Sequence, residues 1–234
     1  MNNPGFRLRI SYGKTGRLRH LSHLELTRAL ERLVRRAQLP YVLTEGFHAR
    51  MKCAFCPALP VGTAGYNELL DVWLESYLSP SDVLRRLRGV TVPDIPINHV
   101  SYCAHKAPSL QASHVLSGYE AVITVSNAQV ISLLEQAFAE LLLAGNITVM
   151  KKGAPKRVDL DDQIYLGPVI TSFDEGGLMA KVALVLRACE QTSIRPDALL
   201  KAALDTVEGA RLVEVIRVML EEEPQGVCHA KHKN

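Results

Sequence analysis

The sequence predicts an α+β fold of two successive βαββαβ units, the topology of tandem ferredoxin-like domains with antiparallel sheets. With 234 residues, the chain is long enough for two small domains. Segments with the period of a strand and segments with the period of a helix follow one another in the same order twice. Between the two passes, residues 107–117 have no clean period and are interpreted as a linker. We therefore predict domains over residues 1–106 and 118–222, with a flexible tail over 223–234.

The first half is expected to begin with a strand at Phe6–Tyr12, where apolar and basic residues alternate. A helix should start after Ser22, because Ser22 and Glu25 have the spacing of a capping box. Its buried stripe has helical spacing and consists of Leu26, Leu30, Leu33 and Ala37. Pro40 ends this helix. The other elements of this half are predicted as a strand over 41–44, a short strand near 53–55, a strand over 68–74, a helix over 79–87 and a strand over 95–102.

The second half is expected to repeat this order. A strand at Tyr119–Val125 leads into a helix that Ser126 caps and that runs to about Leu143. We interpret residues 153–162 as a polar loop. Gly176 and Gly177 indicate a hairpin turn. The remaining elements are predicted as strands over 146–151, 163–173 and 178–186, a helix over 195–204 and a last strand over 211–220.

Composition indicates an ordinary globular protein, with 47% hydrophobic and 22% charged residues. No apolar run is long enough to span a membrane, and the N-terminus lacks the apolar stretch of a secretory signal. The five cysteines are an odd number at irregular positions, which does not fit a disulfide framework. We therefore expect a cytoplasmic protein with no membrane partner.

Positive charge is concentrated at the N-terminal end of the chain. Residues 1–52 contain eleven Lys and Arg against three acids, a net charge of +8, whereas the rest of the chain carries −5. This asymmetry favours a surface that faces RNA or another polyanion. The expected binding residues are basic side chains of the predicted first strand, first helix and following loop: Arg7, Arg9, Arg17, Arg19, Arg28, Arg32, Arg35, Arg36, Arg50 and Lys52. Tyr12 or Phe47 could stack on bases if exposed near them.

Three segments carry a resemblance to a known family: Arg17–Pro40, Glu45–His48 and Lys52–Gly62. They are similar to a bacterial family of radical-SAM-associated proteins of unknown function, whose members stand beside a radical SAM protein or are fused to its C-terminal end. The resemblance extends more loosely over most of the chain, including Lys156–Asp159. It implies a radical SAM protein as partner. The three-cysteine spacing of a radical SAM cluster is absent from this chain, so we expect no cofactor of its own.

Charge and resemblance together favour an accessory protein without catalytic activity that presents tRNA or rRNA to a radical SAM enzyme. A more distant, fold-level similarity is to the CRISPR repeat-processing endoribonucleases, which also pair ferredoxin-like domains. His20, His23 and His48, with Lys52, are therefore candidates for a metal-independent endoribonuclease, as general acid, general base and charge-stabilising group. A protein-protein adaptor for the radical SAM enzyme is the third possibility.

Two sets of residues suggest weaker metal sites. Cys53 and Cys56 have the spacing of a zinc half-site, and Cys103 with His105 could supply a second pair. Cysteines on one strand would point to different faces, which favours packing over metal binding. An acidic set could also bind a metal, although solvated strand ends and a loop are the simpler interpretation: Glu68, Asp71, Asp159, Asp161 and Asp162.

Overall fold

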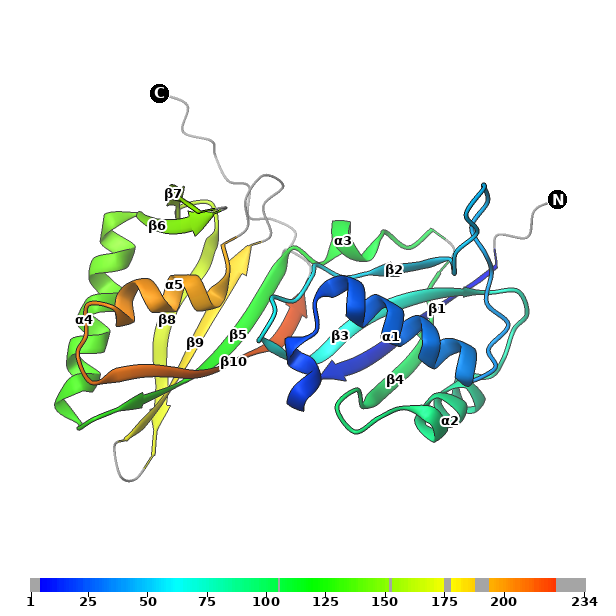
Figure 1. The fold of residues 1–234 in the computed structure, drawn as a ribbon, viewed down its shortest axis with the longest axis horizontal. Coiled ribbons are helices and arrows are strands. Elements are labelled where there is room, and N and C mark those ends of the chain that lie inside the picture. Colours follow the sequence, from blue (N-terminus) through cyan, green and yellow to red (C-terminus); the bar gives the residue numbers. More distant parts are fainter. Residues whose placement is uncertain (1–4, 105, 152, 175–177, 188–193, 222–234) are drawn as a thin grey trace.

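The computed structural model describes residues 5–104, 106–151, 153–174, 178–187 and 194–221 (Figure 1). The first half contains the expected order of strands and helices. Its elements are β1 (Phe6–Lys14), the short 3₁₀ helix η1 (Gly16–His20), α1 (His23–Arg36), β2 (Cys53–Phe55), β3 (Ala64–Leu74), α2 (Pro80–Val90) and β4 (Ile97–Tyr102). A short helix, α3 (Leu110–Ser113), lies between the halves.

The second half has two more strands than the four of a βαββαβ unit. Its elements are β5 (Leu116–Val125), α4 (Gln129–Ala144), β6 (Asn146–Lys151), β7 (Ala154–Asp159), β8 (Ile164–Phe173), β9 (Met179–Arg187), α5 (Pro196–Leu204) and β10 (Ala210–Glu221). β6 and β7 form a separate two-stranded ribbon.

One continuous, mostly antiparallel sheet runs through both halves (Figure 1). Its strand order is β4–β1–β3–β10–β5–β9–β8. β2 also belongs to this sheet and pairs with the same edge of β3 as β10 does. β10 and β3 are parallel neighbours through Ile216 with Ala64 and Arg217 with Gly65. The two halves therefore share a sheet instead of forming the separate sheets that the sequence suggested, because β10 pairs with β5 along one edge and with β3 of the first half along the other.

Two hydrophobic cores lie on the helix side of this sheet. In the first half, alternate residues of β1 and β3 pack with the apolar stripes of α1 and α2, among them Leu8, Ile10, Leu70, Val72, Leu30 and Leu87. In the second half, α4 and α5 cover β5, β9 and β10 in the same way. Leu59, from the loop before β3, is buried in this second core and so ties the two halves together.

The start of α1 confirms its predicted cap. The Ser22 hydroxyl accepts a hydrogen bond from the Glu25 amide, and the Glu25 carboxylate accepts one from the Ser22 amide at 2.8 Å. The four residues of the predicted stripe are all buried. Arg28, Arg32 and Arg36 are exposed, as their positions off the stripe require.

Three predicted elements differ from the structure. Residues 41–44 form only isolated bridges, Tyr41 with Leu74 and Leu43 with Met51. The polar loop predicted over 153–162 is wrong, since β7 pairs with β6 along its whole length. Only Val158 of β7 is buried, so the sequence of this strand does not alternate between apolar and polar residues. The predicted linker contains α3 and the first residues of β5. The predicted turn at Gly176 and Gly177 and the tail over 223–234 lie outside the described residues.

Candidate nucleic-acid interface

A cavity of about 480 Å³ lies between α1 and the segment that joins α2 to β4. Arg28, Arg32 and Arg36 line it, one turn apart on the same side of α1. At 1.5 Å per residue these three positions extend over about 12 Å. The floor is apolar and includes Leu18, Leu21, Leu33, Val90, Val92 and Ile95. We call this feature the α1 groove.

The guanidinium groups of the α1 groove keep their charge exposed. Within the described part of the chain, Arg28, Arg32 and Arg36 form no ion pair. Among the described residues that line the groove, Glu25 is the acid. Hydrogen bonds from Ser22 lower the pKa of Glu25, and the Arg28 charge contributes less. The groove therefore combines three cations with one carboxylate that is already engaged by the helix cap.

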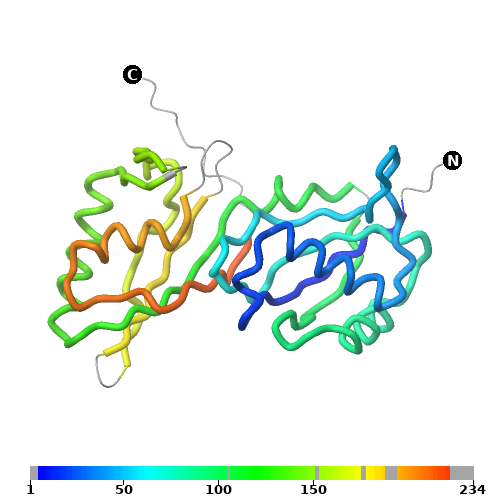
Figure 2. Tube along the Cα trace, in the orientation of Figure 1, coloured from blue at the N-terminus to red at the C-terminus, as the bar shows by residue number. Residues whose placement is uncertain are grey.

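α2 adds positive charge that the sequence reasoning missed. α1 and α2 lie side by side on the same face of the first half (Figure 2). Arg85 and Arg86 both pair with Asp82, and Arg88 donates to the carbonyls of Ile97 and Asn98. The sequence shows this charge as Arg-Arg-Leu-Arg over residues 85–88, at the end of the helix predicted over 79–87. These residues lie outside 1–52, the segment whose positive charge predicted the interface.

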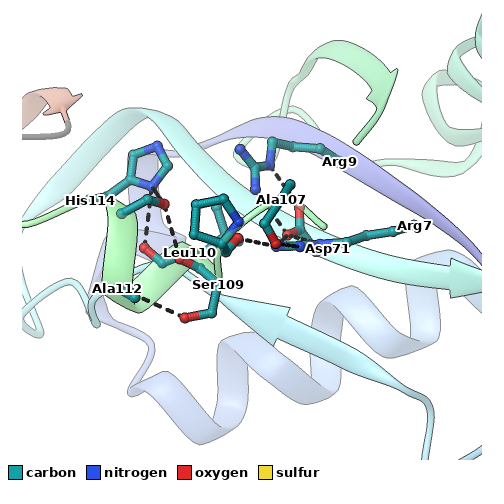
Figure 3. Close-up of polar contacts among 10 residues, drawn as sticks. Arg7, Arg9, Asp71, Ala107, Ser109, Leu110, Ala112 and His114 are labelled. Atoms are coloured by element: carbon teal, nitrogen blue, oxygen red, sulfur yellow. Dashed lines mark hydrogen bonds and ion pairs between the residues drawn. The ribbon is translucent and has the colours of Figure 1, made fainter. Parts of the chain in front are cut away.

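Arg7 and Arg9 do not belong to this interface, contrary to expectation (Figure 3). They lie on the opposite face of the sheet from α1, and both bind the carboxylate of Asp71, which is fully buried. The Arg7 Nε and Arg9 Nε atoms lie 2.9 and 2.8 Å from the Asp71 oxygens. Arg7 also donates to the carbonyls of Ala107 and Pro108, at 2.6 and 2.8 Å. Arg7 therefore anchors the segment that joins the halves, whereas Arg9 shares the Asp71 carboxylate with it.

The Arg7 contacts predict a change in protease sensitivity. Arg7→Ala should speed trypsin cleavage after the exposed Lys106, because two carbonyls just after that bond lose their anchor. Arg9→Ala is the matched control, since Arg9 shares Asp71 with Arg7. Mass spectrometry of timed digests measures the cleavage. Equal rates in the two variants would contradict the anchoring role.

The other predicted basic residues are dispersed. Arg19 pairs with Glu214 of β10 at 2.5 Å. Arg35 points to the other side of α1, where it contacts Glu31 and lies over the ring of Tyr41. Lys52 lies over the ring of Trp73, 5.3 Å from its centroid. Arg17 and Arg50 are exposed, on η1 and on the loop before β2. The predicted basic set is therefore not one continuous surface, because three of its members are paired with carboxylates through long-range contacts.

The candidate catalytic histidines are not brought together. His20 ends η1 and His23 begins α1, where its ring packs edge-on against Phe55 at 5.3 Å. His48 belongs to the loop of residues 44–50, which projects near the opposite end of α1 in Figure 1. Lys52 is engaged with Trp73 on the sheet. The structure thus does not assemble these four residues into an acid-base site.

The cysteines are placed for packing. Cys53 lies on β2 against the first core, whereas Cys56 is buried beside Glu68. Cys103 follows β4 and donates its amide to the Arg7 carbonyl, so three inter-strand spacings, about 14 Å, separate it from Cys53. Among the described residues, no three His, Cys, Asp or Glu side chains are close enough to hold a metal ion. His105 lies outside them.

Burial controls the reactivity of these thiols. It raises the pKa of Cys53 to about 11 and, together with the Glu68 carboxylate, the pKa of Cys56 to about 12. Both are therefore protonated at neutral pH, and only thiolates react as nucleophiles. In native protein at pH 8, iodoacetamide should modify Cys53 and Cys56 far more slowly than in urea, as peptide mass mapping would show. Comparable native and unfolded rates would contradict this burial.

Glu68 and Asp71, two of the five acidic residues interpreted as solvated strand ends and a loop, are instead buried and structural. Glu68 and Asp71 are 2% and 0% exposed, and each is paired with arginine. Asp159, Asp161 and Asp162 lie far along the chain on the exposed end of β7 and the turn after it. Of the possible stacking aromatics, Tyr12 is 1% exposed and belongs to the first core, whereas Phe47 is fully exposed on its loop.

None of the helices in the described residues is long and apolar enough to cross a membrane. No curated protein matches the chain. A chain of a Cbf5–Nop10–Gar1 complex aligns with a TM-score of 0.46 and 13% identity, over 94% of this chain and 50% of that chain. A chain of an H/ACA RNP bound to a substrate RNA containing 2′-deoxyuridine gives 0.44 and 10%, over 95% and 55%.

A heme complex of DypB from Rhodococcus jostii RHA1 gives a TM-score of 0.23 and 8% identity, over 90% of this chain and 91% of that one. The chain thus spans about half the length of the first two matched chains. TM-scores below 0.5 carry no information about its ligands. Sequence comparison is more decisive, because the family described as "Uncharacterized protein conserved in bacteria (DUF2344)" matches residues 7–196. This chain therefore belongs to the DUF2344 family of conserved bacterial proteins.

Proposed function

We propose that this chain is an RNA-binding accessory protein and that the α1 groove contacts the phosphate backbone. The observation that carries the proposal is the row of three exposed arginines without carboxylate partners among the described residues. Guanidinium groups without a carboxylate partner are well suited to phosphate, because they donate parallel hydrogen bonds from a fixed fork.

The spacing of the arginines supports contact with one strand. Neighbouring positions of the row are about 6 Å apart along the helix axis. That distance allows three successive phosphates of an extended strand to meet three guanidinium groups. The described residues that line the groove include no aromatic ring, so its apolar floor offers bases no aromatic surface on which to stack. Such contacts position a nucleic acid without reading its sequence.

The salt dependence of binding is the direct test. Three phosphate contacts on a single strand give a slope of log K against log salt of about −2. Affinity for bulk tRNA should therefore fall roughly twentyfold between 50 and 200 mM KCl in filter binding. Micromolar or weaker affinity at 50 mM with no salt slope would remove the proposal.

We also propose a radical SAM protein as the partner and the cytoplasm as the location. The partner is supported by the resemblance in Arg17–Pro40 and Lys52–Gly62, and the location by the cysteine pattern. Co-purification with the partner, with and without nuclease, separates two versions of this role. Loss of the partner on nuclease treatment supports an RNA-mediated association. Retention supports a protein-protein adaptor.

We further propose that each half is a ferredoxin-like unit. The strand neighbours β4–β1–β3–β2 and β10–β5–β9–β8 support this, since both follow the order fourth, first, third, second within their half once the β6–β7 ribbon is set aside as an insertion. An experimental structure in which either half has another strand order would contradict it.

A further inference from the structure

Three aromatic rings gather outside the α1 groove, at the end of the first half where β1 begins and β4 ends. They belong to Phe6, Tyr77 and Tyr102, and we call them the aromatic cluster. Tyr102 lies opposite Leu8, which is buried in the first core, so the cluster is on the same side of the sheet as α1 and α2. Phe6 and Tyr77 are 40% and 58% exposed. The aromatic cluster therefore presents ring surface to solvent on the face that carries the α1 groove.

The arrangement of the rings leaves one face of Tyr77 open. Tyr77 and Tyr102 are stacked, with ring centroids 5.0 Å apart and an angle of 28° between the ring planes. Phe6 meets both rings edge-on, at 6.0 Å from Tyr77 and 6.3 Å from Tyr102. Because Phe6 is almost equally far from the two, it lies beside the stack and not on top of it. Neither of these rings therefore covers the outer face of Tyr77, which points away from Tyr102.

Main-chain contacts hold this stack in place. The Tyr102 hydroxyl donates to the Leu78 carbonyl at 2.9 Å and accepts from the Leu78 amide at 3.2 Å. Burial raises the pKa of Tyr102, so its hydroxyl stays protonated and donates at neutral pH. The next residue, Ser79, caps α2 by accepting a hydrogen bond from the Asp82 amide. Tyr77 thus precedes a fixed turn, and a ligand loses little affinity to ordering this part of the chain.

α2 connects the aromatic cluster with the α1 groove. The row of groove arginines ends at Arg36 in the last turn of α1, and Arg86 of α2 donates to the carbonyl of Gln38, two residues later, at 3.4 Å. From Arg86 back to Tyr77 the chain takes six steps within α2 and three steps before it. This limits the distance between their Cα atoms to about 20 Å. An extended strand that leaves the groove at Arg36 therefore passes within a few nucleotides of Tyr77.

From this arrangement we propose that Tyr77 stacks on an unpaired base of an RNA strand whose phosphates lie along the α1 groove. The base continues the stack of Tyr102 and Tyr77 on its outer face. Single-stranded RNA is commonly held in this way, by cations along its backbone and aromatic rings against its bases. The adjoining row of arginines favours RNA over a protein surface as the ligand.

This inference rests on the RNA binding proposed above and names the class of RNA. A base within a duplex is already stacked on both sides, so the outer face of Tyr77 selects single-stranded segments. The α1 groove itself does not make this distinction by stacking, since the described residues that line it include no aromatic ring.

Oligouridine of about twelve nucleotides is a suitable probe, because its bases stack little on one another and its length covers both surfaces. Tyr77→Ala should weaken its binding about five- to a hundredfold in fluorescence anisotropy, the range for the loss of one stacked base. The slope of log K against log salt should not change, since no phosphate contact is lost. Tyr77→Phe should keep the affinity. Tyr77→Leu retains apolar contact with Tyr102 but has no ring, so it should bind as weakly as Tyr77→Ala.

Two matched controls isolate the stacking. Tyr66→Ala removes another exposed tyrosine, 49% exposed, near the opposite end of β3, and it should leave the affinity unchanged. An abasic chain of the same length offers the phosphates without the bases. It should therefore bind the unmodified protein and Tyr77→Ala equally.

Unchanged affinity for oligouridine in Tyr77→Ala would overturn the stacking while leaving RNA binding in place. So would an equal loss with the abasic chain or in Tyr66→Ala. Failure of both oligouridine and bulk tRNA to bind the unmodified protein would instead remove RNA binding itself, and the stacking with it. If Tyr77→Ala lost capture of the radical SAM partner but kept its RNA affinity, the aromatic cluster would be a protein contact and the proposal would be wrong.

Discussion

Glu68→Ala is expected to lower the free energy of unfolding by about 3–5 kcal/mol, because it leaves the Arg217 charge buried without its partner. The two side chains are 3% and 2% exposed, and Arg217 Nε lies 2.8 Å from a Glu68 oxygen. Burial disfavours the charge of Arg217, but the Glu68 carboxylate more than offsets this and holds its pKa above the ordinary value. Urea denaturation followed by circular dichroism measures the loss.

The position of this ion pair explains why the effect should be large. Glu68 lies on β3 and Arg217 on β10, the two strands that join the halves. A Cβ atom at position 65 would lie 2.5 Å from a carboxylate oxygen of Glu68. The ion pair between Glu68 and Arg217 therefore also depends on glycine at position 65. Loss of the carboxylate should therefore also loosen the β3–β10 pairing. Faster amide exchange at Ala64 and Ile216 would report that loosening.

Two variants control this prediction. Glu75→Ala removes an exposed acid just beyond the same strand and should change stability by less than about 0.5 kcal/mol. The double variant Glu68→Leu with Arg217→Met replaces the pair by apolar side chains, and it should recover most of the stability lost in Glu68→Ala. A single-variant loss below about 1 kcal/mol would show that water or another group replaces the carboxylate.

Reversing the three groove arginines should abolish the electrostatic part of RNA binding. We expect Arg28→Glu, Arg32→Glu and Arg36→Glu together to weaken tRNA binding at least about a hundredfold at 50 mM salt, since three attractive contacts become repulsive. The slope of log K against log salt should shrink from about −2 toward zero. All three side chains lie off the buried stripe of α1, so the helix should remain folded.

A triple reversal in the second half provides the matched control. Lys181, Lys201 and Arg211 are exposed there, and replacing them by glutamate changes the net charge by the same amount. If binding depends on the α1 groove, this control should keep most of the affinity and the salt slope. Equal losses in both triple variants would indicate a general charge effect and contradict a localised interface. Circular dichroism of both triple variants measures whether they remain folded.

Local pattern predicted much of the fold because its causes lie within a few residues of one another. The cap at Ser22 and Glu25 is one example, since its donors and acceptors are three residues apart. The location of Arg28, Arg32 and Arg36 on one side of α1 is another example, because the geometry of the helix alone sets it. The same reasoning failed for β7. Both faces of this strand are largely exposed, so its sequence lacks the alternation of apolar and polar residues that identifies a strand.

What the sequence by itself determined is the order of strands and helices in the first half, the cap and buried stripe of α1, and the row of arginines that this stripe leaves exposed. Tertiary structure alone decided which charges stay free. Asp71 binds Arg7 and Arg9 from more than 60 residues away, and Glu214 reaches Arg19 across 195 residues. Such pairs depend on strand order and on the course of β10 between the halves. Those are set by packing between distant segments, for which local spacing carries no signal.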